Sequence, residues 1–280
     1  MKKIGIVTDS TADLPRNLIE HYGINVVALK VFFGQEEFKD GFDLTSQEFY
    51  EKLKTSPHHP RTSQPSPAEF KQVYQKLLKD YETIISTHLS SKLSGTYQSA
   101  KLASEMLGND IVVIDSKQAS MVLGLMVLEA ARAVEEGLAR NEVLKSVKEI
   151  ADKIKVYFAV DTLEYLEKGG RIGRASAFLG NLLNIKPVLT LVDGEVSPVE
   201  KVRGSKKVLK KLIEKMESSI KPTSKIKVSV IHAADPETAE VLVQEINKRF
   251  NVEELILAEL GAVIGTYVGP GTIGITFYEV

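Results

Sequence analysis

Short apolar strands alternate with helices through the first half of the chain, and this alternation most constrains the fold. Strands are expected at residues 4–8, 24–33, 81–86 and 111–115, and helices at 15–22, 45–54, 95–107 and 118–136. A further helix should begin at Ser66, which forms a capping box with Glu69 and precedes Pro67. Strands that alternate with helices indicate a parallel or mostly parallel sheet, so we expect an α/β fold.

Two segments of this first half have distinctive compositions. Residues 55–65 contain three prolines, and because proline has no backbone N–H, we expect no regular structure there. The helix expected at 118–136 is apolar around most of its circumference, so it should be deeply buried. Leu123, Val127 and Ala130 lie at helical spacing on it, and they are either ordinary core residues or one wall of an apolar ligand tunnel.

The second half of the chain has a different pattern. Asp193-Gly194 stands between two apolar runs, 186–192 and 195–201, and this arrangement predicts a β-hairpin. Further strands are expected at 156–160, 226–232, 254–259 and 272–278, and helices at 206–219 and 237–250. We therefore expect an N-terminal α/β domain at 1–155 and a C-terminal α+β domain at 156–280.

A turn rich in hydroxyl groups joins the strand at 81–86 to the helix at 95–107, which should end at Gly108-Asn109. The hydroxyls belong to Ser90, Ser91, Ser94 and Thr96. Ligands of open α/β sheets gather where strands end and helices begin, and the free N–H groups of a first helical turn attract anions. Ser94 could present its hydroxyl to a small anion there, or it could merely cap the helix.

Composition excludes several classes of function. The 36 basic and 37 acidic residues leave a net charge of −1, which favours neither a nucleic acid nor a membrane surface as partner. The absence of cysteine excludes disulfides and thiolate catalysis. The histidines form no cluster with metal-ligand spacing, so we expect no metal and no cofactor; they are His21, His58, His59, His88 and His232.

Hydropathy predicts a cytoplasmic protein. The first apolar run is interrupted at Asp9 and is too short for a signal peptide. No later segment is long enough to span a bilayer, so no integral membrane segment is expected.

Six motifs carry a resemblance to a known family. They are Thr8-Asp-Ser-Thr-Ala-Asp-Leu-Pro15, Arg61-Thr-Ser-Gln-Pro65, Leu89-Ser-Ser-Lys-Leu-Ser-Gly-Thr-Tyr97, Tyr165-Leu-Glu-Lys-Gly-Gly-Arg-Ile172, Lys186-Pro187 and Gly269-Pro-Gly271. In this order the chain resembles the DegV family of bacterial fatty-acid-binding proteins, which serve a fatty acid kinase. The resemblance runs from Thr8 to Tyr278. It implies two α/β domains with an acyl chain, for example palmitate, buried in a cleft between them.

The resemblance also implies a role and a site. The protein would be a non-catalytic carrier that presents a long-chain fatty acid to a separate ATP-binding kinase, which makes an acyl phosphate for phospholipid synthesis. Thr62 and Ser94 would hold the carboxylate. Further candidates at the headgroup end are Ser63, Gly95, Arg171 and Tyr267. Many family members have a histidine in place of Tyr267, whose hydroxyl can donate a hydrogen bond but cannot titrate near neutral pH.

This assignment agrees with elementary chemistry. A buried carboxylate needs several donors, because an unpaired one costs several kcal/mol. Neutral hydroxyls leave its oxygen more nucleophilic than an arginine clamp would, which suits a substrate awaiting phosphorylation. The tail would supply affinity at ~0.8 kcal/mol per buried CH₂. The alternative for Thr62 is a residue that orders a proline-rich loop.

A basic run lies between Lys201 and Lys227, with ten basic and two acidic residues. The family resemblance makes Arg171, Arg203 and Lys206 candidates for docking the kinase. The alternative is an ordinary solvated helix face. Gly169-Gly170 precedes Arg171 without the spacing of a phosphate-binding P-loop.

Two other functional classes remain open from the residues. A serine hydrolase would use Ser94 as nucleophile, yet Ser94 is not in a Gly-x-Ser-x-Gly motif, and the nearest base in the sequence is His88. A binder of small phosphorylated metabolites would use the same turn with a short polar pocket.

Overall fold

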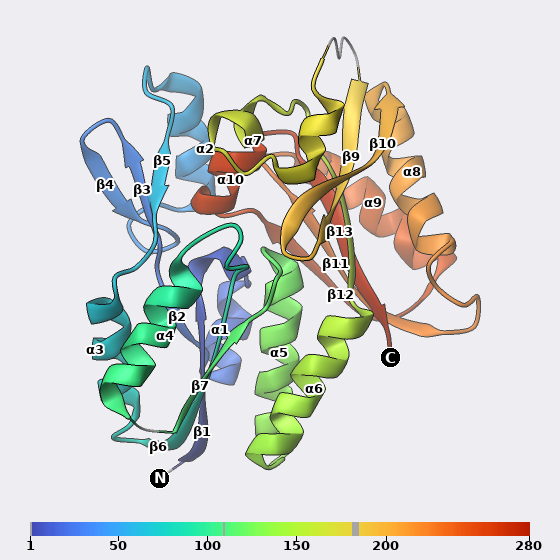
Figure 1. Ribbon diagram of the computed structural model, residues 1–280. Helices are drawn as coiled ribbons and strands as arrows, with labels where there is room; N and C mark the ends of the chain where they lie inside the picture. The colour runs from blue at the N-terminus through green and yellow to red at the C-terminus, as the bar shows by residue number, and fades with distance from the viewer. Residues whose placement is uncertain (1, 109, 181–184) are drawn as a thin grey trace. The chain divides into compact units, whose positions relative to one another are not determined.

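The computed structural model describes residues 2–108, 110–180 and 185–280, without the side chains of Lys2, Ser205 and Lys206. The chain forms two compact units (Figure 1). The first comprises Met1–Thr45 and Pro57–Asp152, and the second comprises Ser46–Ser56 and Lys153–Val280. Because the segment Ser46–Ser56 belongs with the second unit, a single boundary near Lys155 does not describe the division.

A four-stranded parallel sheet forms the centre of the first unit, as the alternation of strands and helices predicts. Its order is β2-β1-β6-β7, and every neighbouring pair is parallel. The strands are β1 (Lys2–Asp9), β2 (Asn25–Val27), β6 (Tyr81–His88) and β7 (Ile111–Asp115). Their carboxyl ends therefore lie along one edge of the sheet, and Asp9, His88 and Asp115 all end strands there.

Helices cover both faces of this sheet. Figure 1 shows α3 (Pro67–Leu77) and α4 (Thr96–Leu107) on one side and α5 (Met121–Glu135) on the other. The remaining helices of this unit are η1 (Ser10–Ala12), α1 (Arg16–Tyr22) and α6 (Arg140–Lys153). The capping box of Ser66 and Glu69 opens α3 as predicted. Helix α4 ends at Gly108, also as predicted, whereas Asn109 lies outside the described residues.

Helix α5 is buried along nearly its whole length, which confirms the expectation from its composition. Leu123, Val127 and Ala130 are all fully buried. Gly124 permits the close approach of η1, since a Cβ there would lie 2.6 Å from the carbonyl oxygen of Ala12. Helix α6 is not among the expected elements. Its two buried apolar residues, Val143 and Val147, have the i, i+4 spacing that indicates a helix.

Two expectations for the first unit are wrong. The strand expected at 24–33 is split into β2 and β3 (Lys30–Phe33), which belong to different sheets. Strand β3 pairs with β4 (Glu36–Lys39) and β5 (Arg61–Ser63) in an antiparallel sheet of order β4-β3-β5. Residues 55–65 therefore contain a strand. Arg61–Ser63 lie in the proline-free stretch between Pro60 and Pro65, so their backbone groups can pair with β3.

A mixed six-stranded sheet forms the centre of the second unit, with the order β10-β9-β8-β13-β11-β12. Only β11 and β12 are parallel neighbours among these described strands. The strands are β8 (Lys155–Ala159), β9 (Ile185–Val192), β10 (Glu195–Arg203), β11 (Lys225–His232), β12 (Asn251–Glu259) and β13 (Ile273–Glu279). The predicted hairpin joins β9 to β10, where Asp193 and Gly194 both have positive φ.

Helices α8 (Ser205–Glu217) and α9 (Pro236–Arg249) pack on the six-stranded sheet through a shared apolar core. Leu212 and Met216 of α8 and Leu242 of α9 are fully buried in this core. The shorter helices of the unit are α2 (Ser46–Thr55), α7 (Glu164–Lys168), η2 (Gly173–Phe178) and α10 (Ala262–Val268). Gly265 in α10 admits the rings of Phe49 and Tyr50 from α2.

Candidate ligand-binding site

The hydroxyl-rich turn lies between the end of β6 and the start of α4. Gly95 is the N-cap residue of α4, so Ser94 immediately precedes the cap. The Ser94 Oγ lies 2.9 Å from the Thr96 Oγ1 and accepts a hydrogen bond from the Thr96 N–H at 3.3 Å. Ser94 is half-buried. Gly95 rather than Ser94 is thus the N-cap residue, although the Ser94 hydroxyl accepts the first N–H of α4.

Polar contacts to the next strand hold this turn in place. Asp115, the last residue of β7, accepts hydrogen bonds from the Ser91 N–H at 3.1 Å and the Ser91 Oγ at 2.5 Å. The Ser90 N–H donates to the carbonyl oxygen of Gln118 at 2.8 Å. The backbone around Ser94 is thus fixed from a neighbouring strand, a rigid support for a group that has to position a ligand.

Thr62 and Ser63 lie on β5 and are half-buried. The next residue, Gln64, connects their strand to the Ser94 turn. A Cβ on Gly95 would lie 2.2 Å from the Gln64 Oε1, and the Gln64 Nε2 donates to the Ser99 Oγ at 3.1 Å. The structure therefore brings the Thr62 strand against the start of α4. The sequence analysis does not identify Gln64 as a site residue. The only signal of this contact in the sequence is Gly95, whose missing side chain leaves room for the Gln64 amide.

In the second unit, Arg171 stacks on Tyr267. The guanidinium carbon of Arg171 lies 4.9 Å from the ring centroid of Tyr267, within cation–π range. The Arg171 Nη1 also donates to the carbonyl oxygen of Gly169 at 2.8 Å. The Tyr267 ring covers Gly169 so closely that a Cβ there would lie 2.3 Å from the ring. The guanidinium of Arg171 is thus held in one orientation.

A chain of buried polar side chains runs behind the Ser94 turn. The His88 Nδ1 lies 2.9 Å from the Asp9 Oδ2, and the His88 Nε2 lies 2.7 Å from the Ser86 Oγ. The Tyr74 hydroxyl donates to the Ser86 Oγ at 2.8 Å. All four side chains are fully buried. Burial raises the pKa of Tyr74, partly opposed by its hydrogen bond to Ser86, so its hydroxyl keeps its proton.

The order of Ser86, His88 and Asp9 resembles the nucleophile, base and acid of a serine hydrolase. A nucleophile must reach a substrate carbonyl, however, and Ser86 lies inside β6 with no exposed surface. The described contacts of His88 are to Ser86, Asp9 and the ring of Phe70. The described geometry therefore does not pair Ser94 with His88 as the hydrolase alternative requires.

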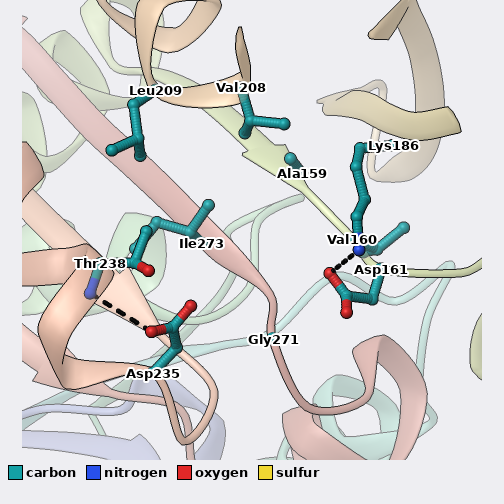
Figure 2. Close-up of a pocket in the computed structure, with 10 residues that line it drawn as sticks. All are labelled: Ala159, Val160, Asp161, Lys186, Val208, Leu209, Asp235, Thr238, Gly271 and Ile273. Atoms are coloured by element: carbon teal, nitrogen blue, oxygen red, sulfur yellow. Dashed lines mark hydrogen bonds and ion pairs between the residues drawn. The ribbon is translucent and has the colours of Figure 1, made fainter. Parts of the chain in front are cut away.

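A pocket in the second unit opens at one edge of the six-stranded sheet (Figure 2). Its polar rim includes Asp161, whose Oδ1 lies 2.5 Å from the Lys186 Nζ, and Asp235, which accepts from the Thr238 N–H at 3.2 Å. The other lining residues are Ala159, Val160, Val208, Leu209, Gly271 and Ile273. The pocket volume is about 160 Å³. Sites for drug-sized ligands usually have roughly 300–1,000 Å³, so this pocket does not accommodate a long acyl chain.

Comparisons with known proteins place the whole chain in one family. Residues 3–280 match the DegV family, whose description is "Uncharacterised protein, DegV family". A fatty acid-binding protein of Thermotoga maritima is 38% identical over 277 residues, covering 97% of this chain and 96% of that protein. The chain belongs to the DegV family. The resemblance inferred from the six motifs is thereby confirmed.

Solved structures of DegV proteins confirm the mixed α/β fold. A DegV family protein from Thermus thermophilus, described by its fatty acid binding, has a TM-score of 0.94 at 39% identity and covers 99% of this chain and 100% of that chain. DegV from Bacillus subtilis, described as a fatty acid binding protein, has a TM-score of 0.92 at 34% identity and covers 100% of both chains.

The motifs that suggested the DegV family have structural roles in the second unit. Lys186 forms its ion pair with Asp161, and Gly271 packs against the same carboxylate, where a Cβ would lie 2.8 Å from the Asp161 Cγ. Gly269 has φ +73° and faces the Tyr165 ring, which a Cβ there would approach to 2.4 Å. These residues fix the loops around α7 and α10.

The basic run is partly neutralised by ion pairs on α8 and β10. The Lys211 Nζ lies 2.9 Å from Glu214 and 3.2 Å from Glu200, and the Lys215 Nζ lies 3.7 Å from Glu200. Hydrogen bonds to Glu214 and Glu200 raise the pKa of Lys211. Arg203 is exposed at the end of β10, whereas the side chain of Lys206 lies outside the described part of the structure. The solvated-face interpretation thus fits the middle of the run.

Neither a membrane-spanning helix nor a set of metal ligands is found among the described residues. In the ranges 2–108, 110–180 and 185–280, no helix has both the length and the apolar content needed to cross a membrane. Across the same ranges, no three His, Asp or Glu side chains come together as a set of metal ligands.

Proposed function

We propose that this protein binds a long-chain fatty acid and holds its carboxylate at the Ser94 turn. One observation carries the proposal: a half-buried serine hydroxyl stands at the carboxyl edge of the parallel sheet, in a chain whose fold matches fatty-acid-binding DegV structures over nearly its full length. Thr62, on the strand that Gln64 connects to this turn, is the second hydroxyl donor.

The energetics favour several neutral donors at this position. A carboxylate withdrawn from water needs hydrogen bonds to replace its hydration, and each such bond contributes roughly 1.5–3 kcal/mol. The hydroxyls of Thr62 and Ser94 supply two, with Ser63 and the backbone at Gly95 as further donors. The acyl tail adds ~0.8 kcal/mol for each buried CH₂. A carrier that uses hydroxyl donors leaves the carboxylate oxygen available for later chemistry.

We further propose that the protein has no catalytic role and presents the fatty acid to a separate kinase that forms the acyl phosphate. Arg171 and Arg203 are the proposed docking residues, together with Lys206. The fixed orientation of Arg171 on Tyr267 supports this role, because an ordered guanidinium loses little entropy on pairing with an acidic partner. The exposure of Arg203 supports it as well.

The first test is to identify what the purified protein carries. Organic extraction followed by mass spectrometry should release a long-chain fatty acid. The variants Ser94→Ala and Thr62→Ala should each bind the acid roughly ten- to hundredfold more weakly, because each loses one hydrogen bond to a charged group. Ser104→Ala is the matched control, since its hydroxyl bonds to the Lys101 carbonyl oxygen on the same helix α4.

Two results would overturn the proposal. One is the absence of any acyl chain in the extract together with unchanged affinity in both variants. The other is hydrolysis of a fluorogenic ester that disappears in Ser94→Ala, since that would make Ser94 a nucleophile. Retention of a small phosphorylated metabolite in the extract would instead support the polar-pocket alternative.

A further inference from the structure

We infer that Asp9 and His88 are positioning residues that set the geometry of the Ser94 turn. This inference rests on the proposed function of that turn. Neighbouring parallel strands bring the two residues together: Val7 of β1 pairs with Ser86 of β6, so two residues later Asp9 ends opposite His88. Both side chains are fully buried at the edge of the sheet where the turn begins.

The Asp9 carboxylate joins the loops that follow both strands. Its Oδ1 accepts hydrogen bonds from the Thr11 N–H at 3.1 Å and from the Thr11 hydroxyl. Its Oδ2 accepts from the Leu89 N–H at 3.1 Å, and Leu89 is the first residue after β6. A single carboxylate therefore fixes the exits of β1 and β6 relative to each other.

The backbone carbonyl of Ser90, the residue after Leu89, links the position of Leu89 to that of Ser94. The carbonyl oxygen of Ser90 accepts hydrogen bonds from the N–H groups of Leu93, at 2.9 Å, and Ser94, at 3.1 Å. Ser90 is itself fully buried. A shift of the Asp9 carboxylate would move Leu89, and with it Ser90, the residue on which the turn is built.

His88 is required in this arrangement because it holds the carboxylate in place. A carboxylate oxygen can only accept, so the His88 Nδ1 that lies 2.9 Å from the Asp9 Oδ2 is the donor. The Ser86 hydroxyl accepts from Tyr74, so its own proton is free to donate to the His88 Nε2. Each of the four side chains in this network, Asp9, His88, Ser86 and Tyr74, thus has a hydrogen-bond partner. Such a satisfied buried network specifies one geometry, whereas a partly satisfied one does not.

The test compares two substitutions of the same residue. His88→Ala removes the donor to Asp9, while His88→Asn places an amide N–H close to where the Nδ1–H stood. Both variants lose the acceptor for Ser86 and the ring that contacts Phe70, so they differ mainly in the Asp9 contact. Thr83→Val is the control, because it removes a hydroxyl that donates to Asp110 at 2.8 Å at the other end of β6.

Two measurements are made on the folded variants. Amide hydrogen exchange of residues 89–94 in the ligand-free protein reports the order of the turn. Palmitate titration reports affinity. We expect His88→Ala to speed exchange in this segment and to weaken palmitate binding by about tenfold. His88→Asn should recover most of both, and Thr83→Val should change neither.

The outcomes separate this inference from the proposed function. Equal losses in His88→Ala and His88→Asn, or unchanged exchange in His88→Ala, would overturn the positioning role. Unchanged palmitate affinity in Ser94→Ala would instead overturn the proposed function of the turn, whatever the exchange rates are. If His88→Ala is unfolded, Asp9→Asn replaces it, because the new amide cannot accept all the hydrogen bonds that the carboxylate accepts; unchanged exchange there counts against the inference.

Discussion

Single residues in this protein are constrained by close contacts that their chemical type alone does not reveal. Gly169 looks like an ordinary helix stop, and it does follow α7 as its C-cap residue. Its lack of a side chain has a second consequence, however, because the Tyr267 ring occupies the space where a Cβ would be. The same ring supports the guanidinium of Arg171. The missing side chain of Gly169 thus leaves room for the ring on which the Arg171 guanidinium stacks.

Substitution of Gly169 should therefore be costly through Tyr267. The φ of Gly169 is −77°, which alanine adopts without strain. We expect Gly169→Ala to lower the free energy of unfolding by about 1–3 kcal/mol, the usual cost of overpacking. In a Tyr267→Ala background the same substitution should cost much less, and urea unfolding of the four proteins measures this coupling. Additive effects of the two substitutions would contradict the contact.

His232 should make stability depend on pH. Burial lowers its pKa below the ordinary 6.5, opposed in part by Glu259 and Asp235. The folded protein therefore binds this proton less readily than the unfolded chain. The contribution is fully present above pH 6.5 and is lost as the pH falls from 6.5 through the lower pKa of the folded state.

The measurement is urea unfolding at pH 7 and pH 5.5 for the wild type and His232→Leu. This histidine can contribute at most about 1.4 kcal/mol per pH unit, and the variant should lose less stability between the two pH values. Parallel losses in both proteins would show that other groups account for the pH dependence.

At the scale of elements, burial alone does not decide what a helix does. Helix α5 was expected to be deeply buried, and it is. Full burial of Leu123, Val127 and Ala130 is what ordinary core packing produces. It is equally what a helix lining an apolar tunnel would show, so the two interpretations have to be separated by function.

The substitution Ala130→Phe separates these interpretations. If this face of α5 lines the acyl tunnel, the bulky ring should shift the preferred fatty acid to a shorter chain, because the headgroup contacts remain. Competition between acids of different lengths measures this preference, after circular dichroism has confirmed that the variant is folded. Overpacking costs typically about 1–3 kcal/mol. An unchanged chain-length preference in the folded variant would assign this face to the core.

At the scale of the whole molecule, the net charge of −1 conceals a local excess of positive charge. The middle of the basic run is tied up by Glu200 and Glu214, which leaves the end of β10 and the start of α8 as the more accessible part. Arg203 and Lys207 are both exposed there. An exposed basic surface such as this one mainly speeds association with an acidic partner.

Reversal of two charges there should therefore slow the partner reaction and spare ligand binding. We expect the double variant Arg203→Glu and Lys206→Glu to reduce acyl-phosphate formation by a fatty acid kinase while palmitate affinity stays unchanged. The reduction should shrink as salt rises, since charges are screened beyond ~8 Å at physiological ionic strength. The pair Lys76→Glu and Lys79→Glu, exposed at the end of α3 and just after it, produces the same change in net charge. Equal effects of the two pairs would rule out a specific docking surface.

The sequence by itself determined the local structure of this protein. The parallel sheet, the capping box at Ser66, the Asp193-Gly194 hairpin and the burial of α5 are all confirmed. The capping box, the hairpin and the burial of α5 depend on residues close together in the chain, and the alternation of strands with helices that predicts a parallel sheet is likewise read along the chain. The motifs likewise identified the DegV family, since they are read in order along the chain.

Tertiary structure decided whatever depends on residues far apart in the chain. The apolar run at 24–33 is divided because its two halves find partners in different sheets. Gln64 meets Gly95, and Asp9 meets His88, through strand pairing and helix packing. Sheet register places Asp9 opposite His88 across 79 residues of sequence. No local pattern encodes such pairs, because each depends on which strands become neighbours and in what register.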